Sequence, residues 1–96
     1  MELLVSYDVS TETKAGQRRL RKVATICQSY GQRVQKSVFE CSLTERQHTI
    51  LIDQLLRTID KDADSLRVYR LGEPRDQHVK AYGIDHRYDP RGPLIV

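Results

Sequence analysis

The apolar side chains of the first thirty residues are spaced as in a buried strand followed by an amphipathic helix. Residues 3–8 form a short apolar run flanked by turn formers, which predicts a central strand ending at Asp8. Over residues 17–30, apolar positions recur at i, i+3, i+4 and i+7, which predicts a helix with one buried face and a cationic outer face. These positions are Leu20, Val23, Ala24 and Cys27. Gly31 follows, where a left-handed cap would end the helix.

The segment after Gly31 predicts an extended stretch, a second helix and a last strand. Residues 32–43 are rich in β-branched and aromatic side chains, and a kink around Lys36 and Ser37 predicts a hairpin or a bulged strand. Thr44 and Gln47 have capping-box spacing and predict the start of a helix that runs to about Asp60. Its predicted buried stripe consists of Leu51, Ile52, Leu55, Leu56 and Ile59. Residues 65–71 (SLRVYRL) predict another strand.

This order of elements predicts an α+β fold. Two helices on one face of a sheet, whose first and third segments each precede a helix, give an α/β sandwich of the ferredoxin-like βαββαβ type. A chain of 96 residues has material for one hydrophobic core, which we assign to residues 1–72. Residues 73–96 form a C-terminal extension. Its apolar end, residues 93–96, seldom stays in water without a partner.

The positive charge of the chain is concentrated on the first predicted helix and the strand after it. Sixteen Lys and Arg residues against thirteen Asp and Glu residues give a net charge of +3. Residues 14–36 contain no acidic residue. They contain Lys14, Arg18, Arg19, Arg21, Lys22, Arg33 and Lys36. Such cations commonly do no more than keep a helix face hydrated. Because no carboxylate nearby in the sequence compensates them, we favour contact with nucleic-acid phosphates. Such binding should tolerate different base sequences and weaken as the salt concentration rises.

The cysteines and the first thirty residues bear on the compartment. Cys27 and Cys41 have no C-x-x-C spacing and fall within a predicted helix and strand, so we expect buried free thiols in a reducing environment. The sequence has neither the pattern of a secretory leader nor an apolar run of about 18 residues. We therefore expect a cytoplasmic protein with no membrane partner.

Asp8 is the candidate metal-binding and catalytic residue. Magnesium usually takes one or two protein carboxylates together with phosphate oxygens, so a single Asp8 could supply about half of the protein's share. A two-fold axis would supply the other half. The alternative is that Asp8 caps the turn before the helix, because Asp followed by Ser10 and Thr11 is ordinary capping composition.

Other side chains leave the function class open. Ser37 could donate its hydroxyl to a phosphate or satisfy the backbone at a bulge, and Tyr7 and Phe39 are typical of a core. The strands lack the aromatic pattern of an RNA-recognition module. A small-molecule regulatory module remains a third class, because this fold serves many functions.

Several separated motifs resemble one family, the small CRISPR-associated nuclease subunit of spacer acquisition. They are YDV at the end of the first strand, RRLRKVA, YGQRVQKSVFEC, DSLRVYRLG and PLIV at the C-terminus. They occur in the family's order, over residues 1–72 and again over residues 93–96. Together they are far more specific than any one of them alone.

The resemblance implies a ferredoxin-like homodimer with an extra C-terminal strand. It implies a divalent-metal-dependent endonuclease on double-stranded DNA or single-stranded RNA. Two Asp8 carboxylates meeting at the dimer axis could share one Mg²⁺ or Mn²⁺, and they would repel each other without it, so we expect weak or conditional activity. It also implies an adaptor that holds DNA between two dimers of the CRISPR integrase subunit; the alternative is a scaffold without chemistry of its own.

The resemblance also implies roles for individual residues. Asp8 matches the family's metal-binding and catalytic aspartate. The family's helix arginines match Arg18, Arg19 and Arg21, and its serine and aromatic after the kink match Ser37 and Phe39. With the cations of residues 14–36 added, the expected nucleic-acid-binding residues are Arg18, Arg19, Arg21, Lys22, Arg33, Lys36 and Ser37. The expected dimer-interface residues are Phe39, Pro93, Leu94, Ile95 and Val96. Residues 73–92 are more polar than the family pattern.

Overall fold

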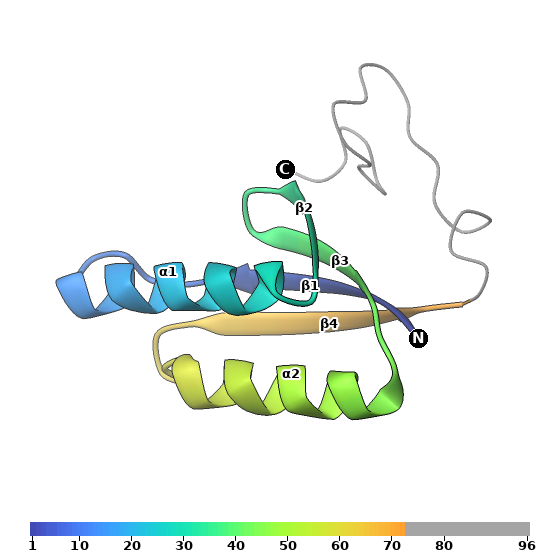
Figure 1. The fold of residues 1–96 in the computed structure, drawn as a ribbon. Helices are drawn as coiled ribbons and strands as arrows, with labels where there is room; N and C mark the ends of the chain where they lie inside the picture. Colours follow the sequence, from blue (N-terminus) through green and yellow to red (C-terminus); the bar gives the residue numbers. More distant parts are fainter. Residues whose placement is uncertain (73–96) are drawn as a thin grey trace, which may run out of the picture.

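The computed structural model describes residues 1–72, which form a four-stranded antiparallel sheet and two helices (Figure 1). The chain order is β1 (Glu2–Asp8), α1 (Lys14–Gln28), β2 (Gly31–Gln35), β3 (Val38–Ser42), α2 (Glu45–Thr58) and β4 (Ser65–Leu71). The strands lie in the order β2-β3-β1-β4, and all three neighbouring pairs are antiparallel. This arrangement confirms the predicted βαββαβ fold. The expected contacts of residues 73–96 lie outside the described residues.

Side-chain caps determine where both helices begin. The Thr13 side chain accepts a hydrogen bond from the Gly16 backbone N–H at 3.0 Å, so α1 starts at Lys14, three residues before the predicted start. Thr44 and Gln47 form the predicted capping box at the start of α2.

The role predicted for Gly31 is wrong. Helix α1 ends at Gln28 with Ser29 as its C-cap in a right-handed conformation, and Gly31 is the first residue of β2 without a left-handed backbone. A side chain at Gly31 would overlap the carbonyl oxygen of Glu40 on β3. Glycine is therefore explained by the close approach of two strands rather than by a helix cap.

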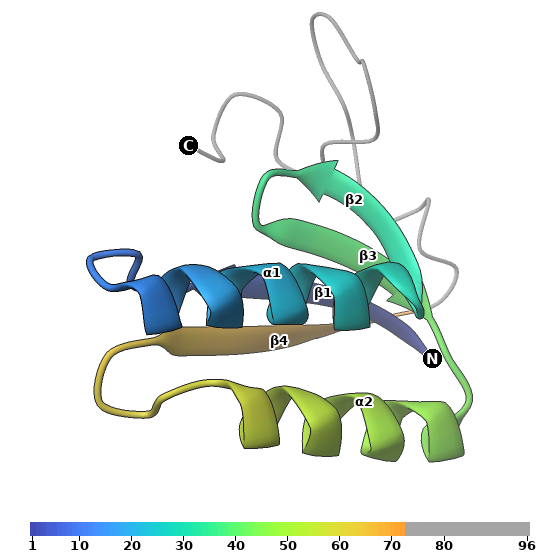
Figure 2. The same ribbon diagram turned by 60° about the vertical axis from the view of Figure 1, so that its left-hand side comes forward.

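The core lies between the two helices and one face of the sheet. Figures 1 and 2 show α1 and α2 side by side, and alternate residues of β1 point towards them. The fully buried members include Leu3, Val5, Val23, Phe39, Leu51 and Leu55. Leu56 was predicted in the buried stripe, but its side chain is 47% exposed. It follows Leu55 by one residue, which turns it about 100° around the helix and away from the sheet.

The opposite face of the sheet carries a smaller apolar cluster of Leu4, Val34 and Val38. Tyr69, which pairs in register with Leu4, is 45% exposed. Phe39 does not belong to this face. It is 0% exposed and packs in the core beside Tyr7, with ring centroids 6.2 Å apart, and its role at a dimer interface stays a prediction.

Candidate nucleic-acid interface

Asp8 ends β1 with its side chain exposed. Within residues 1–72 its carboxylate forms no hydrogen bond or ion pair. The cap of α1 is Thr13, so the capping alternative for Asp8 is wrong. A carboxylate held at a strand end without an internal partner can bind a cation from solvent.

Asp8 shares a cavity of about 420 Å³ with four of the predicted nucleic-acid-binding residues. The cavity lies beside α1 and the β2–β3 turn and is lined by Tyr7, Asp8, Val9, Leu20, Arg21, Ala24, Arg33, Lys36 and Ser37. Three cations and the hydroxyl-bearing Tyr7 and Ser37 therefore line the cavity with a single carboxylate. This is a suitable environment for a phosphate group next to a metal ion.

Two hydrogen bonds from Tyr7 hold the Lys36–Ser37 turn next to the end of β1. The Tyr7 backbone N–H donates to the Ser37 carbonyl at 3.1 Å, and the Tyr7 hydroxyl donates to the Lys36 carbonyl at 3.4 Å. The Arg33 guanidinium also donates to the Lys36 carbonyl. Burial raises the pKa of Tyr7, so its hydroxyl stays a donor at neutral pH. Because Tyr7 precedes Asp8, these bonds fix the turn relative to the carboxylate.

Arg33 lies next to the predicted kink that follows β2. Lys36 and Ser37 form the turn between β2 and β3, which confirms the predicted hairpin, and the strand register shifts just before it, between Arg33 and Gln35. The guanidinium carbon of Arg33 lies 4.9 Å from the centroid of the Phe39 ring, a cation–π contact. Phe39 thus acts from the core by orienting an arginine of the cavity.

Arg18 and Lys22 lie outside this cavity. With Ala15, Arg19, Arg57 and Thr58, they line a second hollow of about 360 Å³. Its lining residues come from α1 and α2, so Arg57 extends the cationic surface of α1 onto the second helix. The signal for Arg57 is weak in the sequence, because Asp53 four residues earlier pairs with it at 3.0 Å.

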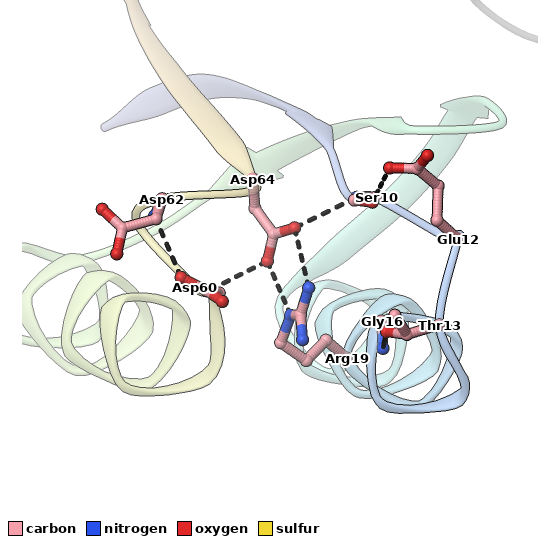
Figure 3. A network of polar contacts seen from close by, with 8 residues as sticks. All are labelled: Ser10, Glu12, Thr13, Gly16, Arg19, Asp60, Asp62 and Asp64. Carbon is pink, nitrogen blue, oxygen red and sulfur yellow. Dashed lines mark hydrogen bonds and ion pairs between the residues drawn. The ribbon is translucent and has the colours of Figure 1, made fainter.

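Arg19 lies in an ion pair that the sequence did not predict (Figure 3). Its Nε lies 2.8 Å from Asp64 Oδ2 and its Nη2 lies 3.2 Å from Asp64 Oδ1. The Asp64 side chain is 0% exposed and the Arg19 side chain 20% exposed. The partners are 45 residues apart, so charge counting along α1 could not detect the pair.

The Asp64 carboxylate also binds two backbone N–H groups. Ser10 donates to Oδ1 at 3.0 Å and Asp60 donates to Oδ2 at 2.8 Å. The hydrogen bond from Arg19, assisted by these backbone donors, lowers the pKa of Asp64 to about 2. Four donors from three segments thus converge on one buried carboxylate (Figure 3).

Comparison with known proteins identifies the family. The family described as "CRISPR associated protein Cas2" matches residues 1–79. The chain belongs to the Cas2 family. It is 53% identical over 96 residues to CRISPR-associated endoribonuclease Cas2 1 of Moorella thermoacetica, covering 100% of both chains. It is 48% identical over 95 residues to CRISPR-associated endonuclease Cas2 of Halalkalibacterium halodurans, covering 99% of each.

A solved structure supports both the family and the fold. The structure of Streptococcus pyogenes Cas2 at pH 6.5 matches with a TM-score of 0.77 and 49% identity, covering 86% of this chain and 100% of that one. The resemblance inferred from the sequence motifs is thereby confirmed. No helix within residues 1–72 is long and apolar enough to cross a membrane.

In this Cas2-family chain, Asp8 fits a metal ion only as one ligand among several. Residues 1–72 contain no group of three or more His, Cys, Asp or Glu side chains placed to hold a metal. A carboxylate oxygen suits Mg²⁺ or Mn²⁺, and such ions usually complete their coordination with water and phosphate oxygens. The donor chemistry fits, and one chain supplies one carboxylate.

Proposed function

We propose that two copies of this chain form a metal-dependent endonuclease that cleaves RNA or duplex DNA. The observation that carries the proposal is the exposed Asp8 carboxylate, which has no partner within residues 1–72 and shares a cavity with Arg21, Arg33 and Lys36. The names of the relatives from Moorella thermoacetica and Halalkalibacterium halodurans, an endoribonuclease and an endonuclease, support this class of reaction. Asp8 of both chains would hold one Mg²⁺ or Mn²⁺ between them.

The residues that line the cavity would have different roles in the reaction. A bound divalent ion would supply charge neutralisation at the scissile phosphate and a more acidic water. Arg21, Arg33 and Lys36 would hold the flanking phosphates, which fixes the substrate without reading its bases. The Ser37 hydroxyl is a further donor to a phosphate oxygen. Because two bare carboxylates repel each other, we expect activity to depend steeply on metal concentration.

Replacing Asp8 by Asn tests the nuclease proposal. The substitution keeps the side-chain shape and removes the charge that holds the metal, so metal-dependent cleavage of single-stranded RNA and duplex DNA should fall at least about 100-fold. Asp62→Asn is the matched control, because Asp62 is an exposed carboxylate in the turn between α2 and β4. Cleavage by Asp8→Asn at the wild-type rate would overturn the proposal.

A second function, a DNA-binding adaptor that bridges dimers of the CRISPR integrase subunit, is favoured by the exposed cations Arg18 and Lys22 on α1. Arg18→Glu with Arg21→Glu should weaken duplex DNA binding and spacer integration while the dimer persists. The slope of log affinity against log salt should become shallower by about 1 for each phosphate that the variant no longer neutralises. Unchanged binding and slope would refute this role.

The dimer in both proposals is supported by the apolar side chains on the sheet face opposite the helices. Leu4 is partly buried there against the buried Val34 and Val38, and Tyr69 of the same face is 45% exposed. We expect this face to take part in the contact, and the apolar residues 93–96 to pack on the partner's sheet. A chain truncated after Gly92 should therefore dimerise more weakly in sedimentation experiments.

A further inference from the structure

We propose that Arg19 and Asp64 are positioning residues that fix the exit of β1, and with it the direction of the Asp8 carboxylate. This inference rests on the proposed nuclease function and changes the role expected for Arg19. The sequence predicts that all the arginines of α1 contact phosphate. Arg19 instead donates two hydrogen bonds to Asp64, a carboxylate with no exposed surface.

The first step of the argument is the position of Asp64 relative to Asp8. Asp64 immediately precedes β4, and Ser65, the first residue of β4, pairs in register with Asp8. On the other side of Asp8, the Ser10 N–H donates to Asp64 Oδ1 at 3.0 Å. Asp8 is therefore held at its own position by the pairing with Ser65 and two residues later by the Ser10 hydrogen bond, and both contacts involve the same loop.

The second step is that the acceptor capacity of Asp64 is fully used. Each of its oxygens accepts two hydrogen bonds, and a carboxylate offers about four acceptor sites. Arg19 supplies two of the four donors in a fork that lysine cannot reproduce. Without the fork, the Asp64 carboxylate would keep only the Ser10 and Asp60 N–H donors, one on each oxygen, and would hold Ser10 less rigidly.

The third step is that Ser10 is also fixed from the side of the helix. A side chain at Gly16 would overlap the Ser10 carbonyl oxygen, so the first turn of α1 packs directly on this backbone. The segment between Asp8 and α1 is thus held through its N–H by Asp64 and through its carbonyl side by α1. Because the Asp8 carboxylate has no partner within residues 1–72, its direction is set by the backbone of Asp8, and these contacts hold that backbone in place.

The test compares Arg19→Lys and Asp64→Asn with wild type. Arg19→Lys keeps the positive charge, so the affinity for duplex DNA should stay within about twofold of wild type. The slope of log affinity against log salt should not change. Cleavage at saturating substrate should fall about tenfold or more, as expected when a catalytic group is misplaced. Arg18→Gln should do the opposite and weaken affinity. Asp62→Asn is the control for Asp64→Asn, because it removes one negative charge from the same loop at an exposed position.

A second measurement does not depend on nuclease activity. Hydrogen exchange at the Ser10 amide should be at least about tenfold faster in both variants than in wild type, with α2 protection retained. If Ser10 exchange stays at the wild-type rate, or if Arg19→Lys weakens DNA binding while cleavage of bound substrate is unchanged, the inference is overturned. If wild type cleaves nothing with added Mn²⁺, the proposed function fails, and Ser10 exchange still decides whether the anchor exists.

Discussion

The Asp64 carboxylate should make the stability of the protein depend on pH, because its pKa differs between the folded and the unfolded chain. Its pKa is lowered from 3.8 to about 2, principally by the hydrogen bond from Arg19. A group whose pKa is lower in the folded state binds its proton more readily when unfolded. Its stabilising contribution is therefore complete above the unfolded pKa, and it disappears as the pH falls from about 4 through about 2.

The size of the effect follows from the same values. A change from 3.8 to about 2 corresponds to about 2.4 kcal/mol of unfolding free energy at neutral pH. Because 20% of the Arg19 side chain is exposed, solvent screens part of the interaction, and we expect about 2 kcal/mol. For a domain of this size that difference corresponds to a decrease of about 8–16 °C in Tm.

The assay is urea unfolding of wild type and Asp64→Asn, followed by circular dichroism at equal protein concentration from pH 7 to pH 2. Asn has one acceptor oxygen where the carboxylate has two, so the variant should be less stable by about 2 kcal/mol at pH 7. The difference should shrink towards zero near pH 2, where Asp64 also becomes protonated. A difference that stays constant down to pH 2, or disappears already at pH 5, would refute the reasoning.

Three further predictions follow from the structure. Gly16→Ala should destabilise the chain by about 1–3 kcal/mol in urea unfolding, because its Cβ would overlap the Ser10 carbonyl oxygen. The Cys27 thiol should resist iodoacetamide at pH 8 until the chain unfolds, because burial raises its pKa to about 12. Asp8→Asn should dimerise at least as tightly as wild type without metal and gain nothing from Mn²⁺; sedimentation velocity with and without the ion measures this.

The fold could be predicted from the sequence because its signals are local. The 3.6-residue spacing around Val23 and Cys27 marks a buried helix face, and Thr44 with Gln47 marks a helix start. The errors concern positions where several local explanations fit. Gly31 suits a helix cap, and the close approach of β3 to β2 that explains it is visible only once the strands are paired.

The candidate site could be predicted only in part. Asp8 and the Lys36–Ser37 kink stand out because a charge or a polar pair interrupts an apolar pattern. Their proximity depends on Tyr7, whose hydrogen bonds to the turn join segments 29 and 30 residues apart. The family resemblance predicts Phe39 at an interface, but the strand alternation puts its ring on the helix side of β3.

The arginines of α1 show why charge density along a helix is an incomplete guide to a binding surface. Successive residues are rotated by about 100°, so neighbours in sequence face different surroundings. Arg18 lines the hollow shared with α2, Arg19 pairs with the buried Asp64, and Arg21 lines the cavity that contains Asp8. Two of the Arg19 nitrogens are engaged by Asp64, whereas Arg18 and Arg21 form no hydrogen bond or ion pair within residues 1–72 and can turn their whole guanidinium groups to a polyanion. Substitutions of all three together would therefore mix weaker binding with altered geometry, and single substitutions are needed to separate these effects.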